Sequence, residues 1–269
     1  MEVLPMVKEG ISLIESEKEK VVGIYYASDL DYCMMKIYYS YIYPAHHDLV
    51  THRRFAIGSA LHSVVQRALD FYGRKHPEIK VFNEPTDVNR IYQIRDIEIH
   101  GRPDTILVSQ DKMDIIEFKS IKNFAYLREA QDKHISQLNY YLHFYPLSEG
   151  HVIYVNKAEN EDELKEFSGF KYDEGLFNIM VDRALTVHDF LIRNMEIEEK
   201  LKTITGEEAD QLIKQLSLPA PEGYLRGGTT DWECKNCPVA KLCYQRIQEK
   251  IVGRKELRAL TKKVLNEVE

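Results

Sequence analysis

The sequence has no run of apolar residues as long as the ~18 that a membrane-spanning helix needs. Its first twenty residues, MEVLPMVKEGISLIESEKEK, lack the basic region followed by an apolar stretch that is typical of a secretory signal. Internal repeats and low-complexity tracts are also missing. Together these absences predict a globular protein of the cytoplasm that does not enter a membrane.

An excess of positive charge is missing as well. The chain carries 43 Asp and Glu against 36 Lys and Arg, which gives a net charge of −7. This balance argues against a protein that coats nucleic acid without specificity, although it leaves room for a local basic groove. Residues 52–54 and 241–263 are locally basic. A solvated face is the alternative for both stretches, and it is the preferred interpretation for the second.

Cysteine is scarce, with four in the chain, but Cys234, Cys237 and Cys243 lie together in CKNCPVAKLC. In a reducing compartment such clustering indicates metal ligation rather than disulfides. A closed site needs a fourth ligand, and Cys33 is the remaining cysteine, so the metal would tie distant parts of the chain together. The spacing does not separate zinc from a [4Fe–4S] cluster, and a zinc site without Cys33 is a further alternative.

The hydrophobic pattern predicts a mixed α/β fold. Strand-like runs in the middle of the chain are bounded by Gly, Pro, Asp or Asn, and their close spacing predicts an antiparallel meander. A helix from Ala125 to Tyr145 follows, then another strand, and helical segments flank this core on both sides. The predicted strands are residues 79–82, 91–101, 104–109, 113–120 and 151–157, and the other predicted helices are 28–43, 58–77, 173–200, 207–216 and 240–268.

Charged residues interrupt two of the predicted strands. Asp104 opens one strand, and Glu117 and Lys119 lie near the end of the next, on one face because side chains alternate along a strand. A turn at residues 111–112 would place Asp104 near Lys119. Two carboxylates can hold a divalent cation, and an ammonium can orient a water and neutralise charge on phosphorus. The alternative is a turn aspartate beside an exposed cross-strand ion pair.

Three further polar residues lie on predicted helices. His62 lies beside an apolar stripe, where a histidine is either a packed core residue or a metal ligand. Gln137 and Tyr141 share one face of the helix that follows Lys119, since they are four residues apart. An amide and a phenol suit hydrogen bonds to phosphate or to a metal-bound water, and an ordinary helix surface is the alternative.

Taken in order, these residues resemble the CRISPR-associated RecB-like exonucleases, the Cas-four family, within the PD-(D/E)xK nuclease superfamily. The cysteine arrangement is also similar to the nuclease domains of AddB and of iron–sulfur helicase-nucleases. The resemblance spans residues 28–245, and its specificity comes from the ordered set rather than from one motif. The matching residues are Cys33 in SDLDYC, His62 in GSALH, Asp104 in GRPD, Glu117 and Lys119 in EFK, Gln137 and Tyr141 in QLNYY, and Cys234, Cys237 and Cys243.

The resemblance implies a restriction-endonuclease-like α/β core, a mixed central sheet flanked by helices. This core would cover about residues 55–157, and the helical and cluster-binding regions would cover residues 1–54 and 158–269. An iron–sulfur cluster would staple the helical regions, so residues 1–269 would form a single nuclease domain.

The resemblance also implies the cofactors and the roles of the site residues. The four cysteines would hold a [4Fe–4S] cluster. Mg²⁺ or Mn²⁺ would bind His62, Asp104 and Glu117, with the backbone carbonyl of Phe118 as a further ligand. Lys119 would position the attacking water. Gln137 and Tyr141 would support the site and the DNA backbone.

The activity implied is DNA cleavage, with exonuclease action on single strands. The family helps to trim spacer precursors for the CRISPR adaptation integrase complex, so single-stranded DNA and that complex are the expected partners. Homo-oligomer formation stays open, because this chain is longer than many members, mostly in residues 157–230. The alternatives are a non-catalytic adaptor that binds DNA ends, a repair, recombination or viral nuclease of the same fold, and a redox protein.

Overall fold

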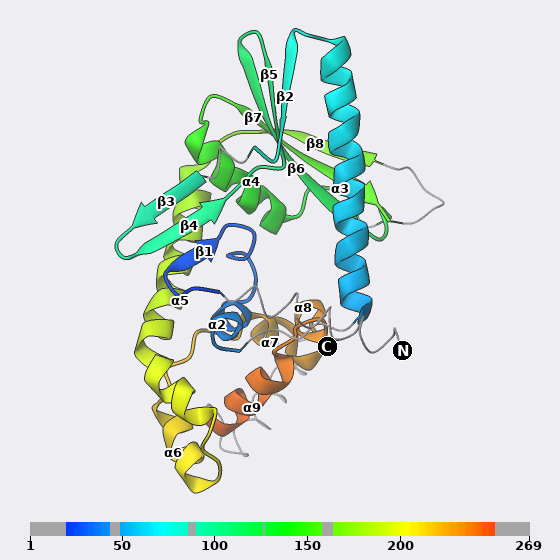
Figure 1. The fold of residues 1–269 in the computed structure, drawn as a ribbon. Helices are drawn as coiled ribbons and strands as arrows, with labels where there is room; N and C mark the ends of the chain where they lie inside the picture. The colour runs from blue at the N-terminus through cyan, green and yellow to red at the C-terminus, as the bar shows by residue number, and fades with distance from the viewer. Residues whose placement is uncertain (1–19, 44–48, 86–89, 126, 158–163, 251–269) are drawn as a thin grey trace, which may run out of the picture. The chain divides into compact units, whose positions relative to one another are not determined.

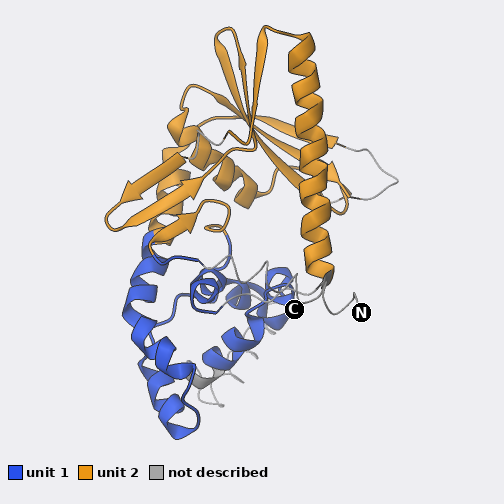
Figure 2. Ribbon diagram, viewed as in Figure 1, with its two compact units in different colours: residues 1–22, 32–46, 185–269 blue, residues 23–31, 47–184 orange. Residues whose placement is uncertain are grey.

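The fold is described from a computed structural model, which covers residues 20–43, 49–85, 90–125, 127–157 and 164–250. The chain divides into two compact units, one formed by residues 1–22, 32–46 and 185–269 and the other by residues 23–31 and 47–184 (Figure 2). Among the described residues, no helix combines the length and the apolar character that a bilayer-spanning segment requires.

The larger unit contains a five-stranded mixed sheet with the strand order β2-β5-β6-β7-β8 (Figure 1). The pairing of β6 with β7 is parallel, and the other three pairings are antiparallel. Two antiparallel strands can be joined by a tight turn, but a parallel pair needs a crossover, which is made by helix α4. The bounds are β2 Ile79–Asn83, β5 Thr105–Ser109, β6 Lys112–Ile121, β7 Glu149–Asn156, β8 Leu164–Phe170 and α4 Asp132–Phe144.

Helices α3 (Leu49–Lys75) and α4 pack against the strands of this sheet. Helix α3 contacts β2 and β6, whereas α4 contacts β6 and β7. Part of the core between these elements is formed by Ile115, Phe118 and Val152. These side chains are fully buried. The mixed sheet flanked by helices agrees with the fold class that the sequence predicts.

A smaller three-stranded sheet lies in the same unit, with the order β1-β4-β3. Strands β3 (Arg90–Ile94) and β4 (Ile97–Gly101) form a hairpin, and β1 (Ile24–Tyr26) pairs with β4 in parallel. The predicted single meander is therefore wrong, because the β3–β4 hairpin belongs to a different sheet from β2 and β5. Alternating apolar residues show that a segment is a strand, but they do not show which strand is its partner.

Gly101, at the end of β4, meets two aromatic rings of α4. A Cβ at this position would lie 2.5 Å from the ring of Tyr140 and 2.8 Å from the ring of Tyr141. Both tyrosines are buried. The missing side chain at residue 101 thus lets β4 approach the helix that carries two of the candidate site residues.

The other unit is helical and includes the C-terminal part of α5 (Glu174–Leu201). Its buried Glu198 accepts hydrogen bonds from the hydroxyls of Tyr38 at 3.1 Å and Tyr43 at 2.9 Å, and Arg246 lies 4.0 Å away. Tyr38 in helix α2 and Tyr43 just after it therefore form core contacts with α5. The remaining elements are α2 Met34–Ile42, α6 Glu207–Gln215, α7 Glu222–Gly227, the 3₁₀ helix Gly228–Thr230, α8 Trp232–Lys235 and α9 Ala240–Lys250.

Several helix boundaries differ from the predictions. Helix α2 begins at Met34 rather than Ser28, because residues 28–32 form turns, and α4 begins at Asp132 rather than Ala125. Helix α3 extends nine residues further toward the N-terminus than the predicted start at residue 58. The predicted continuation of the last helix to residue 268 lies outside the described residues.

Candidate active site

The pairing of β5 with β6 brings the two candidate carboxylates opposite each other. Thr105 pairs with Ile116 and Ser109 pairs with Lys112, so the next pair along the same register is Asp104 with Glu117. The sequence predicted a register in which Asp104 lies near Lys119, two residues away. The difference comes from the two-residue turn, in which Gln110 adopts a positive φ of 42°.

Asp104 is held from two sides. Its Oδ2 accepts a hydrogen bond from the backbone N–H of Phe118 at 2.7 Å, and the Nδ1 of His62 lies 3.9 Å from the same oxygen. The backbone carbonyl of Asp104 accepts a hydrogen bond from Gln66 Nε2 at 3.1 Å. His62 and Gln66 lie one turn apart on α3, so this helix positions both ends of the aspartate.

Lys119 links the carboxylates to α4. Its Nζ lies 2.6 Å from Glu117 Oε1 and donates a hydrogen bond to Gln137 Oε1 at 2.8 Å. The amide of Gln137 in turn donates from Nε2 to the hydroxyl of Tyr141 at 2.8 Å. Alternation along β6 places Glu117 and Lys119 on one face, and the four-residue spacing on α4 does the same for Gln137 and Tyr141.

Burial sets the electrostatics of the pair. It raises the pKa of Asp104 to about 6, against a lowering effect of the Phe118 N–H, and it raises the pKa of Glu117 to about 7. The charge of Asp104 adds to the rise at Glu117, while Lys119 opposes it. Burial also lowers the pKa of His62, which keeps that imidazole neutral and able to act as a ligand.

One unpaired carboxylate oxygen indicates that Asp104 and Glu117 can bind a divalent cation. Glu117 Oε2 is buried and has no hydrogen-bond partner, an arrangement that costs free energy unless another group approaches. A cation bound between Glu117 and Asp104 would supply that partner and offset their repulsion. In the part of the chain that the structure describes, no three His, Cys, Asp or Glu side chains are already grouped as metal ligands, so His62 and the Phe118 carbonyl stay predictions.

The raised pKa values predict a pH-dependent stability of the metal-free protein. The folded protein binds these protons more tightly than the unfolded chain, so the associated stability is present below pH ~4 and is lost as the pH rises through about 7. Glu117→Gln should therefore raise the unfolding free energy in EDTA at pH 8, by on the order of 2 kcal/mol. Urea unfolding at pH 8 and pH 4 measures this difference.

The matched control is Asp111→Asn, which removes one carboxylate from the exposed β5–β6 turn of the same hairpin. It should leave stability almost unchanged at both pH values. A Glu117→Gln protein that is no more stable than wild type at pH 8 would contradict the assignment of a strained carboxylate.

Two residues near Lys119 were not predicted from the sequence. Tyr154 pairs with Lys119 across β6 and β7, and its hydroxyl lies 2.8 Å from Nδ1 of His134 and accepts a hydrogen bond from the backbone N–H of Gln131 at 2.9 Å. Burial and the charge of Lys119 lower the pKa of His134 to about 2, so it adds no second positive charge beside the lysine. The available signal was the i, i+3 spacing of His134 and Gln137.

The Gln137–Tyr141 contact gives a specific prediction for the position of Lys119. Tyr141→Phe removes the acceptor of the buried amide N–H, so the Gln137 side chain loses the contact that orients its oxygen toward the lysine. We expect kcat for cleavage to fall about tenfold and the unfolding free energy to fall by about 1–2 kcal/mol. Single-turnover kinetics and urea unfolding measure the two effects, and a Tyr140→Phe variant on the same helix is the comparison.

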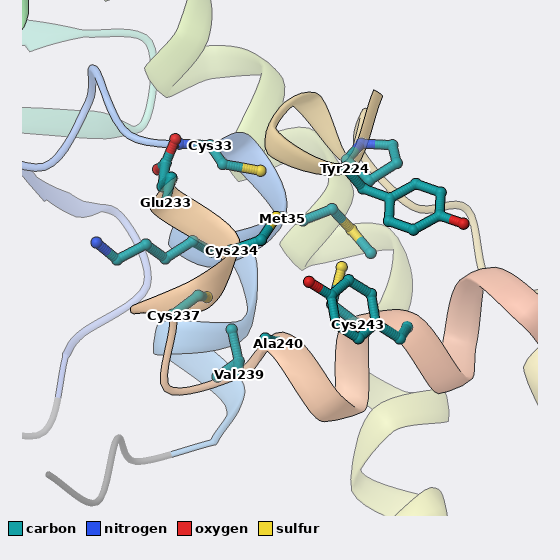
Figure 3. A pocket seen from close by; sticks show the side chains of 12 residues that line it. Cys33, Met35, Tyr224, Glu233, Cys234, Cys237, Val239, Ala240 and Cys243 are labelled. Atoms are coloured by element: carbon teal, nitrogen blue, oxygen red, sulfur yellow. The ribbon is translucent and has the colours of Figure 1, made fainter. Parts of the chain in front are cut away.

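The four cysteines line one cavity within the helical unit (Figure 3). Cys33 immediately precedes α2, Cys234 lies in α8, Cys237 follows α8 and Cys243 lies in α9. The backbone N–H of Cys33 donates to Glu233 Oε1 at 2.7 Å, which ties the start of α2 to α8.

The pKa values of the buried thiols favour a metal centre, whereas the distances between the thiols do not. Burial raises the pKa of Cys234, Cys237 and Cys243, the last to about 12, and the neighbouring thiols add to each rise. Bound metal reverses this cost because it stabilises thiolates. Among the described residues, no three thiols lie close enough together to hold one ion, so the cluster stays a proposal.

Residues 46–244 match the family model of the PD-(D/E)XK nuclease superfamily, which is about three quarters of the chain. The chain therefore belongs to the PD-(D/E)XK nuclease superfamily. No curated protein sequence matches the chain significantly.

Among solved structures, the crystal structure of SSO0001 is similar in fold, with a TM-score of 0.50 and 17% sequence identity, covering 90% of this chain and 96% of that one. The alkaline exonuclease LHK-Exo from Laribacter hongkongensis has a TM-score of 0.43 and 14% identity, covering 67% of this chain and 92% of that one. The structure of LHK-Exo in complex with dAMP has a TM-score of 0.41 and 16% sequence identity, with the same coverage of the two chains.

Proposed function

We propose that the protein is a metal-dependent DNA nuclease that acts as an exonuclease on single strands. The observation that carries this proposal is the pairing of the half-buried Asp104 with the buried Glu117 across a hairpin, with Lys119 bound to Glu117. Membership in the nuclease superfamily supports the same reaction class. A purely structural ion pair would not leave Glu117 Oε2 buried without a partner.

The residues have distinct tasks in this reaction. Asp104 and Glu117 hold Mg²⁺ or Mn²⁺, and His62 and the carbonyl of Phe118 add ligands. When bound, the cation polarises the phosphate and lowers the pKa of a coordinated water. Lys119 orients the attacking water and neutralises charge that develops on phosphorus.

Gln137 and Tyr141 keep Lys119 in place, because the lysine ammonium has its second contact with the Gln137 amide. Burial of Glu117 removes bulk water from one side of the site and strengthens its interaction with Lys119. The contacts with Glu117 and Gln137 therefore hold the Lys119 ammonium beside the carboxylate and oppose its rotation into solvent.

The more specific role that we propose is the trimming of spacer precursors in CRISPR adaptation, in the cytoplasm, together with the adaptation integrase complex. The support for this role is the ordered set of motifs from Cys33 to Cys243. In the same proposal the four cysteines hold a [4Fe–4S] cluster, the whole chain works as one nuclease domain, and it acts alone or as a homo-oligomer.

The test is a cleavage assay with purified protein on DNA strands labelled at the 5′ or the 3′ end. Mg²⁺ or Mn²⁺ should support progressive shortening of single strands, and EDTA should stop it. A double-stranded substrate of the same sequence is the control for strand preference. Binding to DNA ends without cleavage in any metal would instead support the adaptor function.

A further inference from the structure

Lys157 directly follows β7 and lies against α3. Its backbone N–H donates to the carbonyl of Ile121 at 2.7 Å, which extends the parallel pairing of β6 and β7. A Cβ placed on Gly58 of α3 would lie 3.0 Å from Ser120 Oγ and 3.8 Å from Lys157 Nζ. The missing side chain at residue 58 thus lets a hydroxyl and an ammonium gather one helical turn from His62.

The ammonium of Lys157 donates a hydrogen bond at 3.4 Å to the backbone carbonyl of Arg54. Partial burial lowers the pKa of Lys157, and the positive charge of Arg54 lowers it further. Within the described part of the chain, neither side chain forms an ion pair with a carboxylate. The ammonium of Lys157 is partly buried and lies in the field of the exposed Arg54, and a bound anion would offset the free-energy cost of both effects.

These polar groups lie close to the candidate active site. Ser120 follows Lys119 on β6, and Gly58 lies one helical turn before His62, whose Nδ1 is 3.9 Å from Asp104 Oδ2. An anion bound at Lys157 would lie beside the carboxylate pair and not on it. A polynucleotide supplies such an anion, because each scissile phosphodiester is flanked by further phosphates along the strand.

We propose that Lys157, Arg54 and the hydroxyl of Ser120 form a binding subsite for a DNA backbone phosphate next to the phosphodiester that is hydrolysed. The inference rests on the proposed nuclease function and adds a way in which the strand is positioned. Because the phosphate at this subsite is not the one cleaved, the subsite affects binding and KM rather than the chemical step. The other role open to Lys157 is a structural tie between α3 and β7.

The test compares Lys157→Gln with Lys112→Gln, both in the Glu117→Gln background, by fluorescence anisotropy with a labelled single-stranded DNA. Lys112 lies at the opposite end of β6 and its removal changes the net charge equally. Lys157→Gln should weaken binding about tenfold, the value of one charge-assisted contact, and should reduce the salt-dependence slope by about 0.7. Lys157→Arg should restore both, and Lys112→Gln should change neither.

Two further measurements separate the subsite from a structural tie. Arg54 has an exposed side chain, so Arg54→Gln should weaken DNA binding with little change in melting temperature. In otherwise wild-type protein, Lys157→Gln should raise KM and leave kcat within about twofold. Binding and salt slope equal to those of Lys112→Gln, or a Lys157→Arg variant without rescue, would overturn the subsite.

Cleavage by the wild-type protein and DNA binding by Lys157→Gln together show whether the subsite alone is wrong or the nuclease function as well. If cleavage depends on metal and on Glu117 but Lys157→Gln behaves like Lys112→Gln, the subsite alone is wrong. If the wild-type protein neither cleaves nor binds single-stranded DNA, both proposals are wrong.

Discussion

Glu117→Gln is expected to lower the rate of DNA cleavage at least about a thousandfold, the largest effect on activity that we predict. The substitution keeps the size of the side chain but removes the charge that would hold a cation and the partner of Lys119 at 2.6 Å. Glu117 is buried, so water cannot take over either contact. Cleavage of end-labelled single strands under single-turnover conditions measures the rate.

Two comparisons make this result specific to the site. Asp111→Asn, in the turn of the same hairpin, removes one carboxylate from an exposed position and should cleave at the wild-type rate. Lys119→Ala should be as inactive as Glu117→Gln, since both act on the same reacting group. Wild-type cleavage by either the Glu117 or the Lys119 variant would refute the assignment of the active site.

Cys234→Ala is expected to have the largest effect on stability, because it would remove one ligand from the proposed cluster. Cys33 lies about 200 positions before the other three cysteines, and cross-linking so long a loop is worth up to about 5 kcal/mol by chain entropy. The purified variant should lose iron and visible absorbance and should melt at a lower temperature than wild type. Iron analysis, the visible spectrum and thermal unfolding under anaerobic conditions measure these changes.

Val239→Ala is the control, because Val239 lines the same cavity and is buried but carries no ligand atom. It should keep iron and colour while losing about 1 kcal/mol of stability. A wild-type protein that is colourless and holds one zinc ion would contradict the iron–sulfur assignment. Zinc retained by Cys33→Ser would in addition favour the site of three cysteines alone.

Much of the central fold could be predicted because its signals are local. Alternation along residues 113–120 places Glu117 and Lys119 on one face, and the structure has the same arrangement with Phe118 buried. The long helices α3 and α5 follow from apolar periodicity. Their ends were harder to predict, since a turn such as that formed by residues 28–32 differs little from a helix start in a single sequence.

The pairing of strands could not be predicted to the residue. The register of β5 and β6 depends on the turn conformation at Gln110, a non-glycine residue with positive φ that gives no sequence signal. Strand β1 has three residues, which is too short for a period to be seen, and β8 carries Gly169 and many polar residues. Neither strand was predicted, although β8 forms one edge of the five-stranded sheet.

The contacts around the candidate site were the hardest to predict because they come from residues distant in sequence. Gln137 and Tyr141 could be proposed from their spacing, but the link from Gln137 to Lys119 needs α4 to be placed over β6. The neighbours His134 and Tyr154 and the approach of Lys157 to Arg54 depend on the same packing. Such contacts follow from tertiary structure rather than from local propensity.

The parallel pairing of β6 with β7 has a consequence for the newly made protein. The hairpin that joins Asp104 to Glu117 is complete soon after residue 121 leaves the ribosome, since its turn contains two residues. Lys119 acquires its Gln137 contact only after α4, which lies between β6 and β7 in the sequence, has folded back onto β6. A nascent chain that ends soon after residue 121 therefore contains the acidic pair without the Gln137 contact that orients Lys119.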